Sequence, residues 1–193
     1  MSQLVLPTHL GDREERPQDV QTPLWLYREA VRRWGRGGFH IDLAAGASNT
    51  LCPFYFSMEH CGIFYRGNPQ EALMSPVNRV DFLIDQRVLP FPPVSAAPPW
   101  RGWNNPPFED ILPWCKLCHD LVNGGGYEVI VQLLPGRPGT DWWQYAKRHG
   151  AEIHEIRGRV PFVYPDGATK GGNFEWNVFL VWSLPIAVAD FVR

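Results

Sequence analysis

Apolar residues follow two patterns along the chain, one typical of helices and the other of buried strands. The run at residues 127–134 is almost entirely apolar and rich in β-branched residues, which predicts a strand buried on both faces. Alternation of such runs with helical spacing predicts an α/β fold, an open and mostly parallel sheet flanked by helices on both sides. Further strands are predicted at residues 39–45, 100–104, 152–157, 160–164 and 178–183, and helices at residues 24–34, 109–122 and 140–149.

Local signals indicate where two of these helices begin. Thr22 is the expected N-cap of the first helix, with Pro23 at its first helical position. Glu109 and Asp110 are expected to open the second helix, because acidic side chains stabilise the positive end of the helix dipole. The glycines at 124–126 are expected to end it.

The prolines are unevenly distributed along the chain. The sequence of 193 residues holds 19 prolines, and seven of them lie between residues 69 and 99, where the hydrophobic pattern weakens. Within this stretch, only residues 80–89 have a pattern that predicts a strand or a short helix. We therefore interpret residues 66–102 as an insertion, lid or target-recognition element inside a single domain at 21–193, preceded by a flexible segment at 1–20.

Composition and charge narrow the possible functions. With 9 Trp, 6 Tyr and 11 Phe, the chain is too rich in aromatic residues to be disordered. The formal charge of −2 means that any contact with nucleic acid must come from a local basic patch. No apolar window is long enough for a membrane span, and the first residues lack the core of a signal peptide, so we expect a cytoplasmic protein without a membrane partner.

The segment Cys115-Lys116-Leu117-Cys118-His119 matches a haem-attachment pattern and also a redox pair. Both cysteines follow helical apolar spacing, so we interpret them as core residues. The alternatives are redox or haem chemistry, and a zinc site that draws on Cys52, His60 or Cys61. A zinc site would need a second close-spaced pair of ligands, and the sequence has none, so no metal is expected.

Two strand-to-loop junctions have the context of a ligand site but lack a complete nucleotide-binding motif. Residues 136–140 follow a strand and precede a helix, yet the lysine of a phosphate-binding loop is missing. Residues 42–49 lack the glycine spacing of a dinucleotide-binding turn. Their small residues still allow a ligand to approach the backbone closely.

Asn105-Pro106-Pro107-Phe108 is the most specific short signal. Two adjacent prolines fix the backbone and leave their carbonyl groups free as acceptors, beside an asparagine carbonyl and an aromatic ring. This group suits a flat ring that bears an exocyclic amine, because oxygens accept the two N–H groups while Phe108 stacks on the ring. Taken alone, the tetrapeptide could also be a simple turn.

The tetrapeptide has the (N/D/S)PP(Y/F/W) form of amino-methyltransferases, and the chain resembles the phage-type DNA adenine N-6 methyltransferase family (Dam-like). The similarity runs in order through residues 20–183. It includes Thr22-Pro23 with Trp25, Phe39, Asp42, Ala44-Ala45, Asn49, Cys52, Tyr55, Trp103, the tetrapeptide, Leu134-Pro135, Arg137, Thr140, Trp142-Trp143, Gly158-Arg159, Phe162 and Trp182.

The resemblance implies a Rossmann-like class I methyltransferase that transfers a methyl group from S-adenosylmethionine to the N-6 amine of adenine in double-stranded DNA. The target base would be flipped out of the duplex. Asn105, Pro106, Pro107 and Phe108 would be the catalytic residues. The expected cofactor-binding residues are Thr22, Pro23, Asp42, Ala44, Asn49 and Glu59, and the expected DNA-binding residues are Arg137, Trp142, Arg157 and Arg159.

Two departures from the family keep other readings open. The usual Asp-Gly-Leu step corresponds here to Glu59-His60-Cys61-Gly62-Ile63, so Glu59 is the first candidate for the ribose-binding acid, with Asp81 or Asp85 as alternatives. The insertion could place another acceptor in the pocket, such as a cytosine amine, RNA or a modified base. A non-catalytic DNA-binding phage protein is the third reading. Host, restriction partner and oligomeric state, monomer or weak dimer, stay open.

Overall fold

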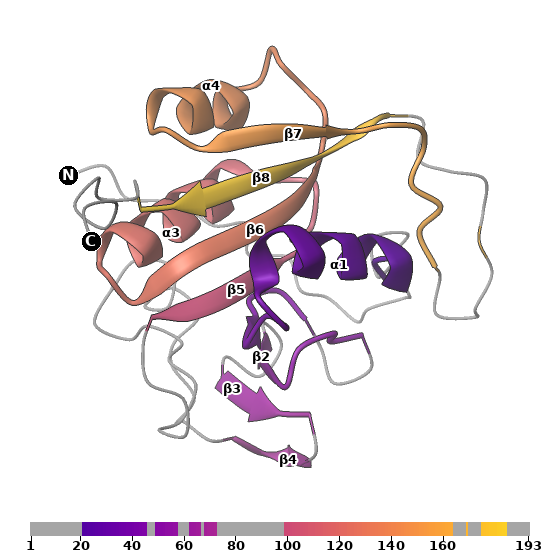
Figure 1. Ribbon diagram of the computed structural model, residues 1–193, viewed down its shortest axis with the longest axis vertical. Helices are drawn as coiled ribbons and strands as arrows, with labels where there is room; N and C mark the ends of the chain where they lie inside the picture. The colour runs from indigo at the N-terminus through magenta and orange to yellow at the C-terminus, as the bar shows by residue number, and fades with distance from the viewer. Residues whose placement is uncertain are drawn as a thin grey trace, which may run out of the picture.

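A computed structural model describes residues 21–45, 49–57, 62–66, 68–72, 99–163, 169 and 175–184, and the statements below concern those residues. They form one eight-stranded sheet with the strand order β4-β3-β2-β1-β5-β6-β8-β7 (Figure 1). The strands are β1 (Ile41–Asp42), β2 (Phe54–Ser57), β3 (Gly62–Tyr65), β4 (Asn68–Ala72), β5 (Trp100–Asn104), β6 (Tyr127–Pro135), β7 (Glu152–Ile156) and β8 (Asn177–Ser183). The helices are α1 (Leu24–Ala30), its π-helical continuation η1 (Val31–Gly35), α3 (Leu112–Asn123) and α4 (Asp141–Arg148).

The sheet is mixed, which corrects the prediction of a mostly parallel one. Its central strands β2, β1, β5 and β6 are parallel to one another. The outer strands β3 and β4 on one side, and β8 and β7 on the other, join by antiparallel pairing. Parallel neighbours need a crossover of a dozen or more residues, usually a helix, whereas only a few residues separate β2 from β3, so this pair can only be a hairpin.

Helices cover both faces of the sheet, as the sequence predicts. Helices α3 and α4 pack on one face, and α1 packs on the other (Figure 1). Strand β6 serves both layers, because successive side chains of a strand point to opposite faces. Ile130 and Leu134 lie in the layer with α3, while Val129, Val131 and Leu133 lie in the layer with α1.

The helix starts differ from the prediction by one to three residues. Pro23, rather than Thr22, is the N-cap of α1, and its carbonyl accepts the backbone N–H of Leu26 at 2.9 Å. Helix α3 begins after Glu109 and Asp110, with Pro113 in its first turn. A proline fits the first turn because its missing N–H would have no helical partner there.

Two predicted strands are shorter or missing. Residues 39–45 yield only the short strand β1, since the backbone turns after Asp42. Residues 160–163 form no strand, and Val163 makes only isolated bridges with Gln21 and Thr169. Pro161 explains this, because it cannot donate to a ladder. The predicted segment 80–89, the N-terminal segment 1–20 and most of the insertion lie outside the described residues.

Candidate active site at the carboxyl edge of the sheet

The parallel strands β1, β5 and β6 end at one edge of the sheet, which we call the carboxyl edge. Asp42 of β1 is in register with Trp103 of β5, and the backbone N–H of Leu43 donates to the carbonyl of Trp103 at 2.8 Å. The segments that follow these strands are therefore neighbours. In open α/β sheets this edge is where ligands bind.

Asn105-Pro106-Pro107-Phe108 directly follows β5 at this edge. Pro106 is buried, Pro107 is exposed, and the Phe108 ring contacts the ring of Phe162 edge-on, with centroids 6.1 Å apart. The side-chain oxygen of Asn105 is shielded from solvent and, among the described residues, has no hydrogen-bond partner. A buried acceptor without a partner costs about 1–3 kcal/mol, so this oxygen is suited to receive a donor from a ligand.

Asp42 holds the turn after β1. Its side chain is buried, and one carboxyl oxygen accepts the backbone N–H of Ala44 at 3.3 Å. Burial raises the pKa of this carboxyl to about 7, against a smaller opposing effect of hydrogen bonds from the backbone of Ala44 and Leu51. After Leu43 the turn continues through Ala44 and Ala45, whose small side chains would let a ligand lie close to the backbone.

Tyr27 and Cys52 form a buried pair near Asp42. The Tyr27 hydroxyl and the Cys52 sulfur are 3.5 Å apart. Burial raises the pKa of both groups, and the Asp42 carboxyl raises each of them further. Tyr27 and Cys52 therefore stay neutral near neutral pH, whereas the Asp42 carboxyl gains its charge as the pH rises through about 7.

The start of α1 also reaches the carboxyl edge. The backbone of Gln21 bridges that of Val163, beside Phe162, which contacts Phe108. Thr22 and Pro23 follow Gln21 and are buried. Asn49 is half-buried between β1 and β2, whereas Glu59, Asp81 and Asp85 lie outside the described residues. The structure therefore brings the first helical segment and the tetrapeptide to one place.

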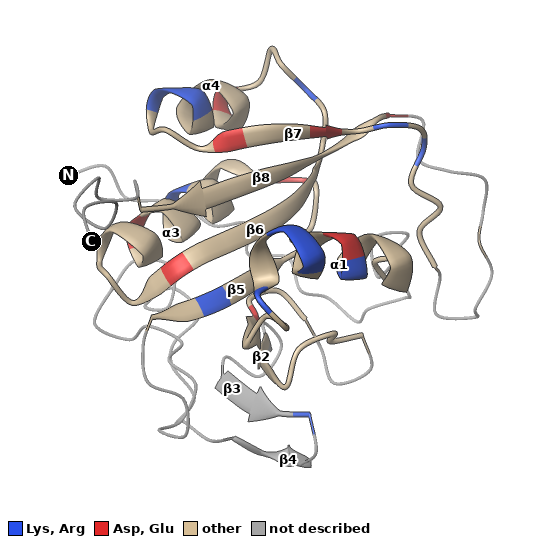
Figure 2. Cartoon of the chain, in the orientation of Figure 1, with Lys and Arg blue, Asp and Glu red and all other residues tan. Residues whose placement is uncertain are grey.

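The candidate DNA-binding arginines follow β6 and β7. Arg137 comes after β6 and forms an ion pair with Glu175 at 2.7 Å. Strand β7 runs in the same direction as β6, so the exposed Arg157 and Arg159 that follow it belong to the carboxyl edge as well. Figure 2 shows basic segments after β7 and along α1. Trp142, in contrast, is only 4% exposed and packs in the core.

The cysteine motif is part of the core. Cys115 and Cys118 are free thiols buried on the inner face of α3, as the sequence predicts. Burial raises the pKa of Cys118 well above its usual value, so the reactive thiolate is disfavoured. In the described part of the chain, no group of three His, Cys, Asp or Glu residues could hold a metal ion. No described helix has the length and apolar character needed to cross a membrane.

Sequence reasoning missed one buried polar cluster. The Gln132 side chain on β6 is hydrogen-bonded to Asn104 on β5 and to Trp182 on β8. The available signal was Gln132, a polar residue inside an otherwise apolar strand. Both the oxygen and the nitrogen of the Gln132 amide have partners here, which offsets the cost of burying them.

Comparison with known proteins does not assign the chain to a family. No protein-family model and no curated protein matches it. Among solved structures, one similar chain is a Pyrococcus horikoshii protein described as a candidate RNA methyltransferase. The two chains share 11% sequence identity with a TM-score of 0.49, over 89% of this chain and 91% of that chain. The site is therefore interpreted from its own residues.

Proposed function

We propose that this protein transfers a methyl group from S-adenosylmethionine to the exocyclic N-6 amine of an adenine in DNA. The observation that carries the proposal is the buried, unpartnered oxygen of Asn105, among the residues described, at the end of β5. Pro106, Pro107 and Phe108 follow it and add carbonyl acceptors and a ring. Among common ligand groups, the amine of a flat heterocycle matches this set.

The chemical difficulty lies in the amine, whose lone pair is delocalised into the ring. The Asn105 oxygen and the Pro106 carbonyl accept its two N–H groups, which favours a tetrahedral nitrogen with its lone pair free. When bound, S-adenosylmethionine supplies an electrophilic methyl group on a positively charged sulfur. The amine nitrogen would take the methyl group, S-adenosylhomocysteine would leave as the neutral thioether, and the nitrogen would release one proton to solvent.

The small residues and the fixed turn at the end of β1 support a contact with S-adenosylmethionine there. Ala44 and Ala45 lack bulk, and Asp42 fixes the turn through its hydrogen bond to the Ala44 N–H. In the proposal, Thr22, Pro23, Asn49 and this turn contact the cofactor, with Glu59 as the acid for the ribose. Asp42 contributes by shaping the turn, because its carboxyl already has backbone partners.

DNA would be held by local positive charge, since the chain as a whole carries −2. We assign phosphate contacts to Arg137, Arg157 and Arg159, and stacking on the flipped base to Phe108. The buried position of Trp142 gives it a packing role beneath this surface. The insertion at 66–102 is the candidate element for reading the target sequence.

The test is a product assay. Purified protein is incubated with S-adenosylmethionine carrying a labelled methyl group and with unmethylated duplex DNA of mixed sequence, and the DNA is then digested to nucleosides. We expect label in N-6-methyladenine. Label in a cytosine derivative, or label only when RNA replaces DNA, would correct the acceptor. Absence of transfer to any of these substrates, from protein that is folded, would refute the proposal.

A further inference from the structure

Three buried side chains form a hydrogen-bonded row across neighbouring strands. The Trp182 indole N–H on β8 donates to the side-chain oxygen of Gln132 on β6 at 2.7 Å. The Gln132 amide nitrogen donates to the side-chain oxygen of Asn104 on β5 at 2.8 Å. Asn104 and Gln132 are fully buried, and they are also direct partners in the strand register.

Donor counting fixes the orientation of every amide in this row. An indole N–H can only donate, so Gln132 must present its oxygen to Trp182. Its nitrogen then faces Asn104, which must present its oxygen to Gln132. The Asn104 nitrogen is left on the far side of the amide, and two residues on neighbouring strands hold it in that orientation.

The Asn104 nitrogen has no hydrogen-bond partner among the described residues, although it is completely buried. An unsatisfied buried donor destabilises the fold, and its retention needs a reason. Asn104 immediately precedes Asn105, whose side-chain oxygen is also unpartnered within the described structure. The carboxyl end of β5 thus carries one oriented donor and one acceptor, both shielded from solvent, and a ligand would need two different atoms to satisfy them.

We propose that Asn104 is a ligand-binding residue, whose side-chain N–H donates to an acceptor atom of a heterocycle bound at the carboxyl edge. Gln132 and Trp182 are its positioning residues. This inference rests on the proposed function. A purine ring nitrogen is the acceptor class, and both the cofactor and the target adenine carry such atoms.

Two variants reverse the polarity that Asn104 presents. Asn104→Asp keeps the shape and the acceptor for Gln132, but replaces the free N–H group by an oxygen. Gln132→Glu offers an oxygen to Asn104, so the Asn104 amide turns over to donate to it and presents its own oxygen to the ligand. Each variant should weaken binding of the same ligand about tenfold or more, which corresponds to about 1.4 kcal/mol.

The control is Leu121→Ala, a buried position on α3 that takes no part in the row. It lowers stability by creating a cavity, and it should leave both ligand affinities within twofold of wild type. Thermal unfolding of all the variants separates loss of the fold from loss of a ligand contact.

Two readouts identify the ligand. Calorimetry with S-adenosylhomocysteine reports on the cofactor, and KM for DNA at saturating cofactor reports on the base. A loss confined to the first places the acceptor on the cofactor, and a loss confined to the second places it on the target base. Wild-type affinity and KM in both folded variants would overturn the inference and leave the proposed function intact.

A measurement on the wild-type protein covers the case in which the variants do not fold. The side-chain amide signals of Asn104 in a nitrogen-15 spectrum should shift when S-adenosylhomocysteine or DNA is added. No shift with either probe, while wild-type methyl transfer is observed, would overturn the inference. Absence of both cofactor binding and methyl transfer in the wild type would instead refute the proposed function and the inference with it.

Discussion

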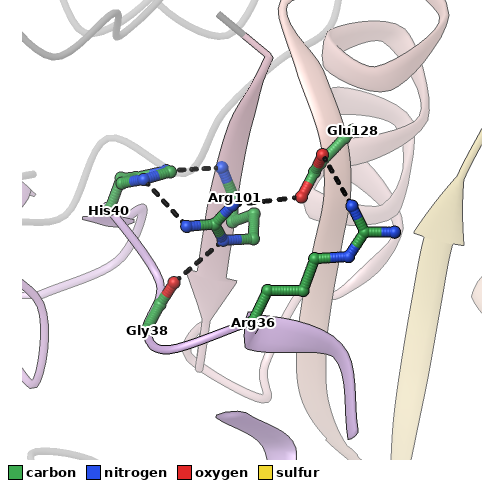
Figure 3. Close-up of polar contacts among 5 residues, drawn as sticks. All are labelled: Arg36, Gly38, His40, Arg101 and Glu128. Carbon is green, nitrogen blue, oxygen red and sulfur yellow. Dashed lines mark hydrogen bonds and ion pairs between the residues drawn. The ribbon is translucent and has the colours of Figure 1, made fainter. Parts of the chain in front are cut away.

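The two ends of strand β5 differ in how far their polar side chains are hydrogen-bonded. At the amino end, Arg101 is fully engaged, with its side chain bonded to the carbonyl of Gly38 at 3.0 Å and to Glu128 at 3.2 Å (Figure 3). Its backbone N–H donates to a ring nitrogen of His40 at 2.9 Å. At the carboxyl end, Asn105 carries a buried polar atom that lacks a partner within the described chain.

We call the amino end the structural end and, on the proposed function, the carboxyl end the ligand end. Burial, with a smaller contribution from Arg101, lowers the pKa of His40 and so keeps the ring neutral and able to accept. Arg101 thereby ties together the segment before β1 and the start of β6. Among the described residues, the amino end of β5 leaves one buried polar atom without a partner, the Trp100 indole nitrogen, whereas the carboxyl end leaves two on successive residues, Asn104 and Asn105.

The largest effect is expected at the ligand end. On the proposed function, Asn105→Ala removes the oxygen that would hold the amine, so kcat should fall by about 100-fold or more, as for other single acceptors or donors that act in a transition state. Asn105→Asp, which is a natural form of the motif, should retain part of the activity. Affinity for S-adenosylhomocysteine should stay within about twofold. An Asn105→Ala variant that transfers at the wild-type rate would show that the oxygen has no catalytic role.

On the neighbouring strand β1, the buried Asp42 carboxyl should make stability depend on pH. Its folded-state pKa of about 7 lies above its ordinary value of 3.8, so the protonated form favours the fold. Stability from this group is complete below about pH 4 and is lost as pH rises through 7. Asp42→Asn should therefore be more stable than wild type at pH 8, by up to about 4 kcal/mol, and nearly equal at pH 4. Urea unfolding at several pH values measures this, and parallel curves for the two proteins would contradict it.

Breaking the structural end should affect stability alone. Arg101→Met leaves Glu128 and the Gly38 carbonyl without their main partner, and should cost about 2 kcal/mol of unfolding free energy, because the site is only partly buried. At a temperature where the variant is folded, kcat should match wild type. A large fall in kcat with unchanged stability would contradict the division between the two ends.

The smallest effect concerns DNA binding. Replacing Arg157 and Arg159 by Gln should reduce the slope of log affinity against log salt by about 2, with a loss of only severalfold in affinity at low salt. The matched control replaces Lys147 and Arg148, which are exposed and lie at the end of α4, just before β7 begins at the opposite edge. Equal slopes for the two double variants would show that the carboxyl edge is not the DNA-binding face.

Local patterns predicted the central elements well because packing and local preference agree there. The run at 127–134 became β6, and the cysteines of α3 are core residues. The antiparallel pairing of β8 could not be read from its own residues, because an apolar strand suits either direction. The prediction of Thr22 as the N-cap was wrong by one residue, since Pro23 is the N-cap and the helix begins at Leu24.

The candidate site was predictable only in part. The tetrapeptide was visible as a motif, but the unpartnered state of the Asn105 oxygen depends on what packs around it in three dimensions. The orientation of Asn104 depends on Gln132 and Trp182, which lie 28 and 78 positions further along the chain. Contacts of this kind leave almost no trace in a single sequence.

The most direct test of the account is a crystal structure of the protein with S-adenosylhomocysteine and a duplex containing adenine. We expect the cofactor over the turn after β1, and a flipped adenine whose N-6 amine lies within hydrogen-bond distance of the Asn105 side-chain oxygen. A cofactor bound elsewhere, or an Asn105 oxygen that stays unpartnered while both ligands are bound, would contradict it.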